Sequence, residues 1–323
     1  MVQLGDQIDA GGGKDKTTGQ DKFRHERRVH HDLETLLFTD YLQTISKGHF
    51  INIIGNHEWM NALNEFKYVH LQNAYDARKG HFDPQNGLMA YILKRRHFLC
   101  CINNAVFSHA GLHGRALTRL GVQLQDLLDD TWVDRFNEFL DDDKNFRDPR
   151  SDRLFEAVIY NGDPTSNDIS LLWNRKHDIT GVVDNKQDIS PQLLFDKLDI
   201  NINVTGHNKY RGDKILLGRR KGSGEVEVIQ VSAEDKGGVV LTSDNGERYL
   251  VACDNMKETT KATDKTSTFL YAEFRALNSS GTFEKMYVHK SECGGDIACP
   301  LIPPVVDEYL RCRKALPPIS TGS

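Results

Sequence analysis

The sequence has no long apolar run and no leader-like start, and both absences narrow what the protein can be. No run of about eighteen apolar residues occurs along its 323 residues, so we expect no helix that spans a bilayer. The first residues do not combine a basic segment with an apolar one, as a secretory signal would. The sequence therefore favours a cytoplasmic protein.

Cysteine is scarce, and no two cysteines have the spacing of a CxxC pair. The chain carries six of them, at Cys100, Cys101, Cys253, Cys293, Cys299 and Cys312. So few thiols in a chain of this length favour reduced cysteines in a reducing compartment. A Cys293–Cys299 disulfide is the weaker alternative.

A strong excess of one charge is also absent. The net charge is -5 and the mean hydropathy is -0.53, which describe a globular chain with a polar surface. Neither value gives a reason to expect nucleic acid or an anionic membrane as partner. We expect the short basic clusters Lys94–Arg96 and Arg219–Lys221 to be exposed, and the acidic run Asp141–Asp143 to be a solvated face.

What the sequence does contain is one pattern repeated four times, a short apolar run followed by a polar cluster. The four stretches are Met1–Asp9, Phe50–Glu58, Ala105–Gly111 and Ile202–His207. Short apolar runs between helical patterns are typical of strands buried on both faces. Ligands gather at the carboxyl ends of such strands. We therefore expect Asp6, Asn56, His109 and His207 to meet in one crevice.

The spacing of apolar residues predicts the elements between these stretches. Helices are expected over residues 23–46, 60–71, 83–95, within 114–160 and over 191–198. Strands are expected over 98–102 and 105–107, on either side of a turn at Asn103 and Asn104. This order of strands and helices favours a layered α/β fold.

After His207, the chain alternates short apolar runs with turn residues, a pattern that indicates β-strands. Strands are expected over residues 215–217, 226–231, 239–241, 248–252, 269–274 and 286–289. We expect them to form a second, antiparallel-leaning sheet that packs on the first. Residues 1–290 then make one domain, and residues 291–323 an irregular tail that contains several prolines.

The four strand-end residues form a mixed oxygen and nitrogen donor set. Such a set suits Mn, Fe, Zn or Ni better than Ca or Mg. The two oxygens of Asp6 could bridge a second ion, and two ions would clamp a phosphoryl oxygen and ionise a water. His57, beside Asn56, is placed to give the leaving alkoxide a proton. Asp9 or Glu58 could orient His57, although Glu58 could equally open the following helix.

The motifs G-D-Q-I-D, G-N-H-E, S-H-A-G and the late G-H, in this order, resemble the motif series of the calcineurin-like metallophosphoesterases. The resemblance is closest to the phosphoprotein phosphatase family. It extends over roughly residues 1–256 and includes the stretches L-L-W-N-R and V-A-C-D-N-M. The His-Ala-Gly form and the Trp173–Arg175 stretch look closer to the bacterial-type, Shewanella-like branch than to the main eukaryotic enzymes.

This resemblance implies a fold, an activity and a cofactor. The implied fold is a layered αββα sandwich of two mixed sheets flanked by helices, over residues 1–290. The implied activity is hydrolysis of phosphomonoesters on protein serine, threonine or tyrosine by a metal-bound hydroxide, with no phosphoenzyme. The implied cofactor is a pair of divalent ions, with Mn, Fe or Zn expected, and the implied partner is a phosphoprotein or a small phosphoester.

The resemblance also implies a role for each motif residue. Asp6 would bridge the two ions, and three further ligands would complete the second metal site, at Asn56, His109 and His207. His57 would be the general acid and Asp9 its partner.

This chain departs from the family pattern at two places. The family carries an Asp-x-His motif on an earlier strand, and here only five residues precede Asp6. Either the chain is an N-terminal truncation or one metal has been lost; we expect truncation, because the second ligand set is complete. Ala10 stands where the family usually has an arginine that contacts phosphate, and Arg175, with Arg211 behind it, is the expected substitute.

The same residues are compatible with two further functions. The same ligands could serve a dinucleoside polyphosphate hydrolase. A protein that keeps the fold and one metal could instead be a non-catalytic scaffold. The sequence does not indicate the substrate, the metal, the regulators or the oligomeric state.

Overall fold

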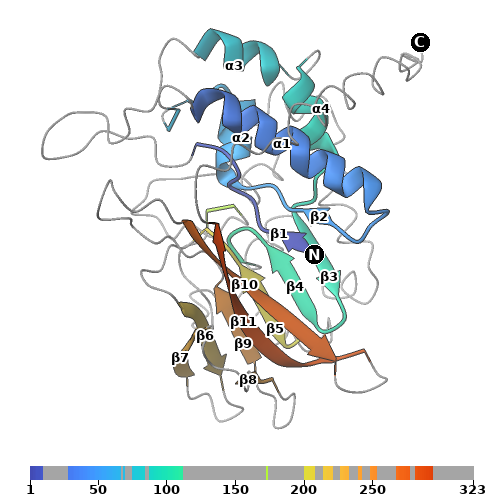
Figure 1. The fold of residues 1–323 in the computed structure, drawn as a ribbon, viewed down its shortest axis with the longest axis vertical. Coiled ribbons are helices and arrows are strands. Elements are labelled where there is room, and N and C mark those ends of the chain that lie inside the picture. Colours follow the sequence, from blue (N-terminus) through green and yellow to red (C-terminus); the bar gives the residue numbers. More distant parts are fainter. Residues whose placement is uncertain are drawn as a thin grey trace, which may run out of the picture.

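A computed structural model describes residues 1–9, 28–66, 68–69, 75–83, 87–111, 172–173, 200–207, 214–220, 226–232, 239–241, 248–252, 267–276 and 281–293. Its helices gather on one side of the molecule, and the strands of its larger sheets lie on the other (Figure 1). The helices are α1 (Arg28–Ile45), α2 (Asn56–Ala62), α3 (Tyr75–His81) and α4 (Leu88–Lys94). In this part of the chain, no helix has the length and apolarity to cross a membrane.

The strands of the described residues form three sheets, which have the orders β1-β2, β3-β4-β5-β9-β6-β7 and β10-β11-β8. Their bounds are β1 Val2–Gln3, β2 Ile51–Asn52, β3 Leu99–Ile102, β4 Ala105–Ser108, β5 Ile202–Thr205, β6 Lys214–Arg220, β7 Val226–Ser232, β8 Val239–Val240, β9 Arg248–Ala252, β10 Ser267–Ala276 and β11 Phe283–Cys293. β1 runs parallel to β2, and β4 runs parallel to β5. Within each pair, therefore, the carboxyl ends of the two strands lie at the same edge.

The six-stranded sheet has a hydrophobic core on each face. Along β4, Val106 belongs to the core shared with the helices, whereas Ala105 and Phe107 belong to the core shared with the three-stranded sheet. Successive side chains of a strand point to opposite faces, so both cores can be built from one short apolar run. The ring of Phe107 meets that of Phe274 on β10 edge to face, with centroids 6.0 Å apart.

The mixed α/β class agrees with the sequence, but several helix bounds differ. α1 and the β3–β4 hairpin lie where they were expected. α2 begins at Asn56 and ends at Ala62, instead of covering 60–71, because Gly55 and Glu58 start it early. α4 starts at Leu88 rather than near Pro84. α3 was not expected, since its sequence has no apolar period; the expected helices within 114–160 and 191–198 lie outside the described residues.

The expected division of strands between sheets was wrong. β6, β7 and β9 join β3, β4 and β5 in one sheet, and only β8, β10 and β11 form a separate one. An apolar pattern fixes which face of a strand is buried, but not which strand lies beside it. The outer helical layer that a four-layer sandwich needs beyond the three-stranded sheet is not among the described residues. The four-layer arrangement therefore stays a prediction.

Two side-chain expectations can also be compared with the structure. Arg96 was expected to be exposed, yet it is 2% exposed and donates hydrogen bonds to Gln7 Oε1 at 2.7 Å and Thr39 Oγ1 at 3.1 Å. Cys100 and Cys101 are free thiols, and burial raises the pKa of Cys100 to about 12. Cys100 is therefore a structural thiol rather than a reactive one.

The core that the six-stranded sheet shares with the helices, here called the helix-side core, should contribute strongly to the free energy of unfolding. Phe98 is fully buried, and its ring lies 6.2 Å from that of Trp59 between centroids. We expect Phe98→Ala to lower the free energy of unfolding by about 3–5 kcal/mol, because the truncation leaves a cavity. Ile45→Ala, at a side chain that is 53% exposed, is the control and should change it by less than about 0.5 kcal/mol. Urea denaturation of both variants measures the difference, and equal losses would contradict this core.

Candidate metal centre

The loop that carries Asp6 is held against the start of α2 by one buried carboxylate. Glu58, which is fully buried, accepts hydrogen bonds at Oε2 from the backbone N–H groups of Asp6 at 2.9 Å and Gly55 at 2.8 Å. Its Oε1 accepts from the N–H of Gln7. In return, Asp6 Oδ1 accepts from the N–H of His57 at 3.1 Å. The β1 and β2 strand ends are thus locked together.

Two glycines allow these loops to approach so closely. Gly5 has φ +84°, which favours glycine, and a Cβ there would lie 2.5 Å from Gly55 N and 2.8 Å from His109 Nδ1. A Cβ at Gly55 would collide with the backbone and side chain of Asp6. Both positions therefore need glycine for space, and Gly5 needs it for conformation as well.

The structure brings the four predicted ligands together at these strand ends. His109 Nε2 lies 2.8 Å from Asn56 Oδ1, 3.1 Å from His207 Nδ1 and 3.3 Å from Asp6 Oδ2. The ligand atoms of Asp6, His109 and His207 all lie within 4.8 Å of one another. His109 follows β4 and His207 follows β5, so the expected gathering at the carboxyl ends is what the fold produces.

These separations fit one coordination sphere. An ion with bonds of about 2.1 Å to nitrogen or oxygen holds neighbouring ligand atoms about 3.0–3.4 Å apart in octahedral or tetrahedral geometry. The distances from His109 Nε2 to His207 and Asp6, 3.1 and 3.3 Å, lie in this range, and the 2.8 Å to Asn56 is slightly shorter. The donor set of two imidazoles, one amide oxygen and one carboxylate also suits a divalent transition ion. The residues present therefore fit a metal ion.

Neighbouring groups fix the orientation of both imidazoles. His109 Nδ1 lies 2.6 Å from the carbonyl oxygen of Leu4, so this nitrogen carries the proton, and Nε2 faces the other donors. The indole of Trp173 meets the ring of His207 edge to face, with centroids 5.9 Å apart. Trp173 is 8% exposed and belongs to the core that the six-stranded sheet shares with the helices.

The charges of the cluster shift its proton affinities. Burial alone would raise the pKa of Asp6, but the charge and hydrogen bond of His109 and the charge of His57 outweigh burial and lower it strongly. Burial would lower the pKa of His109, and the attraction of Asp6 outweighs it, so that pKa is raised. The lowered pKa of Asp6 favours its ionised form, which a metal-ligating carboxylate requires.

His57 and Asp9, the predicted acid and its partner, lie beside the cluster. His57 Nδ1 is 3.6 Å from Asp9 Oδ2, and Nε2 is 3.9 Å from Asp6 Oδ2. Burial opposes the charged imidazolium of His57, but Asp9, Asp6 and Glu58 outweigh it and raise the pKa of His57. The ring also packs against Tyr68, with centroids 4.9 Å apart. Of the two candidate partners, Asp9 is the one that faces Nδ1.

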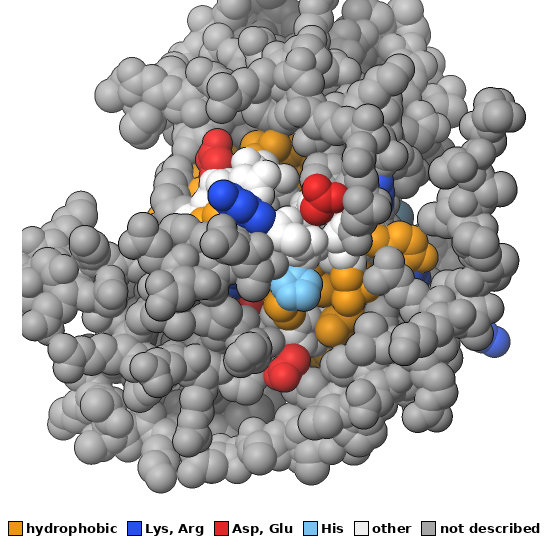
Figure 2. Space-filling view, turned by 90° about the horizontal axis from the view of Figure 1, so that it is seen from above, with side chains coloured by type: hydrophobic (Ala, Val, Ile, Leu, Met, Phe, Trp, Pro, Cys, Tyr) orange, Lys and Arg blue, Asp and Glu red, His pale blue; other side chains and the backbone are white. Residues whose placement is uncertain are grey.

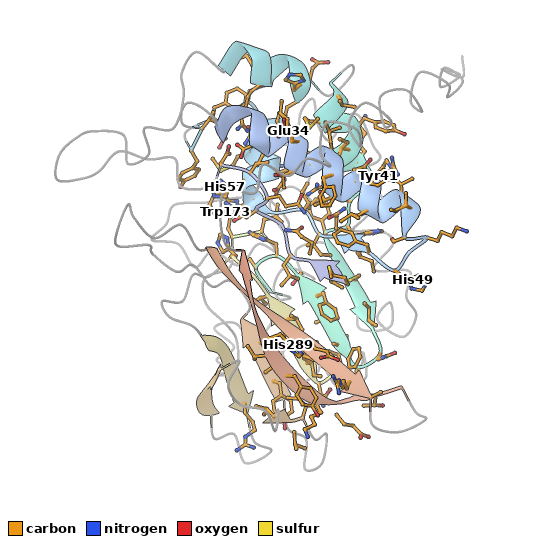
Figure 3. All side chains as sticks on the ribbon, viewed as in Figure 1. Glu34, Tyr41, His49, His57, Trp173 and His289 are labelled. Carbon is orange, nitrogen blue, oxygen red and sulfur yellow. The ribbon has the colours of Figure 1, made fainter. Side chains whose placement is uncertain are left out.

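The His57 side chain keeps some solvent access. Its side chain is 17% exposed, and that of Asp6 is 20% exposed. In the view of Figure 3, His57 and Trp173 appear in the same region of the molecule, and His49 appears apart from both. The face seen in Figure 2 exposes histidine surface together with acidic side chains near its centre. The side chains of His57 and Asp6 are thus partly accessible to solvent.

Three residues around Asp9 were not predicted from the sequence. Asn61 Nδ2 donates to Asp9 Oδ2 at 2.6 Å, and Arg78 Nη1 lies 3.1 Å from Asp9 Oδ1. Asp32 Oδ2 accepts from the backbone N–H of Asp9 at 3.3 Å. Asn61 stands four residues after His57 on α2, so helical spacing could have placed it on the same face. The sequence gives no such signal for Arg78 or Asp32.

The predicted phosphate contacts, Arg175 and Arg211, lie outside the described residues and stay predictions. A second metal ion also stays a prediction. Within the described part of the chain, the one group of three or more clustered His, Cys, Asp or Glu ligands is that of Asp6, His109 and His207.

No known protein-family profile and no curated protein matches the chain. Two solved structures match it, a cold-active protein-tyrosine phosphatase of a psychrophilic Shewanella species and a mutant of a cold-active protein tyrosine phosphatase. Each is 16% identical with a TM-score of 0.43, and the match covers 79% of this chain and 59% of the other. This chain thus matches less than two thirds of either one. The likeness is too distant to assign a family or an activity.

Because the loops after β1 and β2 approach each other closely at Gly5, a substitution there should change metal affinity. We expect Gly5→Ala to weaken Mn²⁺ or Zn²⁺ binding, because the added methyl group would push Gly55 and His109 away from Asp6. Gly48→Ala is the matched control: Gly48 also has positive φ, but its Cβ would meet nothing within 4 Å. Gly48→Ala should lower the free energy of unfolding by about 1–2 kcal/mol and leave metal binding unchanged. Titration calorimetry measures the affinity, and equal effects of the two variants would contradict the geometry.

Proposed function

We propose that this protein is a metal-dependent phosphomonoesterase that acts on phosphoproteins. The observation that carries the proposal is the spacing of the donor atoms around His109 Nε2, which fits a single ion. A protonatable histidine with a carboxylate partner lies directly beside that cluster. This combination of a Lewis-acid site and an adjacent proton donor suits hydrolysis of a phosphate ester.

Each described residue has a part in this mechanism. Asp6, Asn56, His109 and His207 would hold the ion. When bound, the ion would offset charge on a phosphoryl oxygen and make water a better nucleophile. His57 holds a proton at the edge of the cluster and gives it to the leaving oxygen. The raised pKa of His57, to which Asp9, Asp6 and Glu58 contribute against burial, favours the protonated imidazole.

The finer features of the proposal follow the sequence resemblance. They comprise a second divalent ion bridged by Asp6, a layered αββα sandwich, phosphate binding by Arg175 and Arg211, and hydrolysis of phosphoserine, phosphothreonine or phosphotyrosine. We propose Mn, Fe or Zn as the metal. Asp6 supports the second ion because its carboxylate is partly exposed while one oxygen faces His109.

Hydrolysis of phenyl phosphate by the full chain with added Mn²⁺ tests the proposal. The phenoxide leaves poorly and needs a proton, so His57→Ala should lower kcat about 10²- to 10⁴-fold. Asp6→Asn should lower both bound metal and activity, because it removes the only carboxylate of the donor set. His49→Ala, at an exposed histidine, is the matched control and should match the wild type.

The outcomes separate an enzyme from a binding protein. Bound Mn²⁺ without hydrolysis of any phosphate ester would overturn the enzymatic proposal and favour a scaffold. Parallel assays with phosphoserine, phosphothreonine and phosphotyrosine peptides and a dinucleoside polyphosphate identify the substrate class. Preference for the dinucleotide would overturn the phosphoprotein assignment while leaving the metal-dependent chemistry in place.

A further inference from the structure

A buried arginine holds the Asp9 carboxylate, and the proposed mechanism gives that arginine no role. The side chain of Arg78 on α3 is 3% exposed. One arm, Nη1, lies 3.1 Å from Asp9 Oδ1. The other arm, Nη2, donates to Asp32 Oδ2 on α1. A single guanidinium therefore ties the loop of Asp9 to two helices.

Asn61 completes this arrangement and divides the two oxygens of Asp9 between different partners. Its Oδ1 accepts from Arg78 Nη1 at 2.8 Å, and its Nδ2 donates to Asp9 Oδ2 at 2.6 Å. The same Nδ2 donates to the carbonyl oxygen of His57 at 2.9 Å. Oδ1 of Asp9 thus faces Arg78, while Oδ2 faces Asn61 and His57. The carboxylate cannot rotate without losing both sets of contacts.

We infer that Arg78 is a positioning residue for proton donation by His57, acting through the orientation of Asp9. This role rests on the proposed phosphomonoesterase function. The Arg78 fork fixes Asp9 Oδ1, which leaves Oδ2 directed at His57 Nδ1. The orientation in turn keeps the opposite nitrogen, Nε2, facing the metal cluster, where the leaving oxygen needs its proton.

A purely structural role for Arg78 would be to neutralise two buried carboxylates, and lysine separates the two roles. Lysine keeps the positive charge, but its ammonium is a single point that cannot reproduce a planar fork reaching Asp9 and Asp32 together. Neutralisation alone predicts that Arg78→Lys, which keeps the charge, changes the rates for all substrates little and by the same factor. Positioning predicts a selective loss of acid catalysis.

The experiment compares two esters that differ in their need for a proton. Phenyl phosphate has a poor leaving group, whereas p-nitrophenyl phosphate has a good one. We expect Arg78→Lys to lower kcat for phenyl phosphate at least about tenfold more than for p-nitrophenyl phosphate. Arg95→Lys is the matched control, since Arg95 also bridges two groups, Asp40 at 3.3 Å and Thr44 at 2.7 Å, further along α1. In Arg95→Lys, the ratio of kcat for phenyl phosphate to kcat for p-nitrophenyl phosphate should equal that of the wild type.

Equal losses for the two esters, or no loss, would overturn the positioning role. If Arg78→Lys does not fold, Asp32→Asn serves instead. It removes the negative charge that faces Nη2 and keeps an amide oxygen that can still accept from the N–H group of Asp9. The selective loss should then have the same direction and a smaller size.

A spectroscopic readout keeps this inference separate from the proposed function. In the Zn²⁺-loaded chain, the ¹⁵N signal of His57 Nδ1, identified by its absence in His57→Ala, should show a protonated nitrogen beside a carboxylate. Arg78→Lys should move that signal toward a solvent-exposed imidazole, and an unchanged signal would overturn the inference. If the wild type hydrolyses neither ester, the proposed function fails, and the signal alone decides whether Arg78 orients His57.

Discussion

The candidate site depends on one buried carboxylate, that of Glu58. It accepts hydrogen bonds from three backbone N–H groups on two separate loops, those of Asp6, Gln7 and Gly55. A buried charge is expensive unless it is paired and hydrogen-bonded, and each bond to a charged group contributes about 1.5–3 kcal/mol. The guanidinium of Arg96 supplies the opposite charge nearby. The β1 loop and the start of α2 are thereby fixed to each other before any ligand binds.

That constraint allows unfavourable backbone conformations to persist around the site. Asp6, Asp9 and His207 all have φ between 55° and 60°, a region that side chains other than glycine seldom adopt. Such residues cost about 1–3 kcal/mol each unless the surrounding structure holds them. Glu58 and Gly5 hold Asp6, while Arg78, Asn61 and Asp32 hold Asp9. Asp6 and Asp9, which carry part of the proposed chemistry, are therefore each held by several polar contacts.

The sequence predicted the meeting of four side chains at one place better than it predicted the sheets. Asp6, Asn56, His109 and His207 each follow a short apolar run, and parallel strands bring such residues to one edge. The partners of β6, β7 and β9 could not be predicted, because alternation marks a buried face and not a neighbouring strand. Arg78 gave no signal either: it lies on a short helix without an apolar period and reaches Asp9 only through the fold. Local patterns locate strand ends, while long-range polar contacts depend on tertiary packing.

The Asp9 network shows how such a contact can support proton transfer. Its charged groups are the two carboxylates of Asp9 and Asp32, the guanidinium of Arg78, and the imidazole of His57. With one positive charge from Arg78, the cluster is neutral only when His57 also carries its proton. Burial of Asp32 outweighs the attraction of Arg78 and raises the pKa of Asp32. Burial opposes the charge on His57, but Asp9, Asp6 and Glu58 outweigh it and raise the pKa of His57, so these carboxylates favour the imidazolium form that a general acid requires.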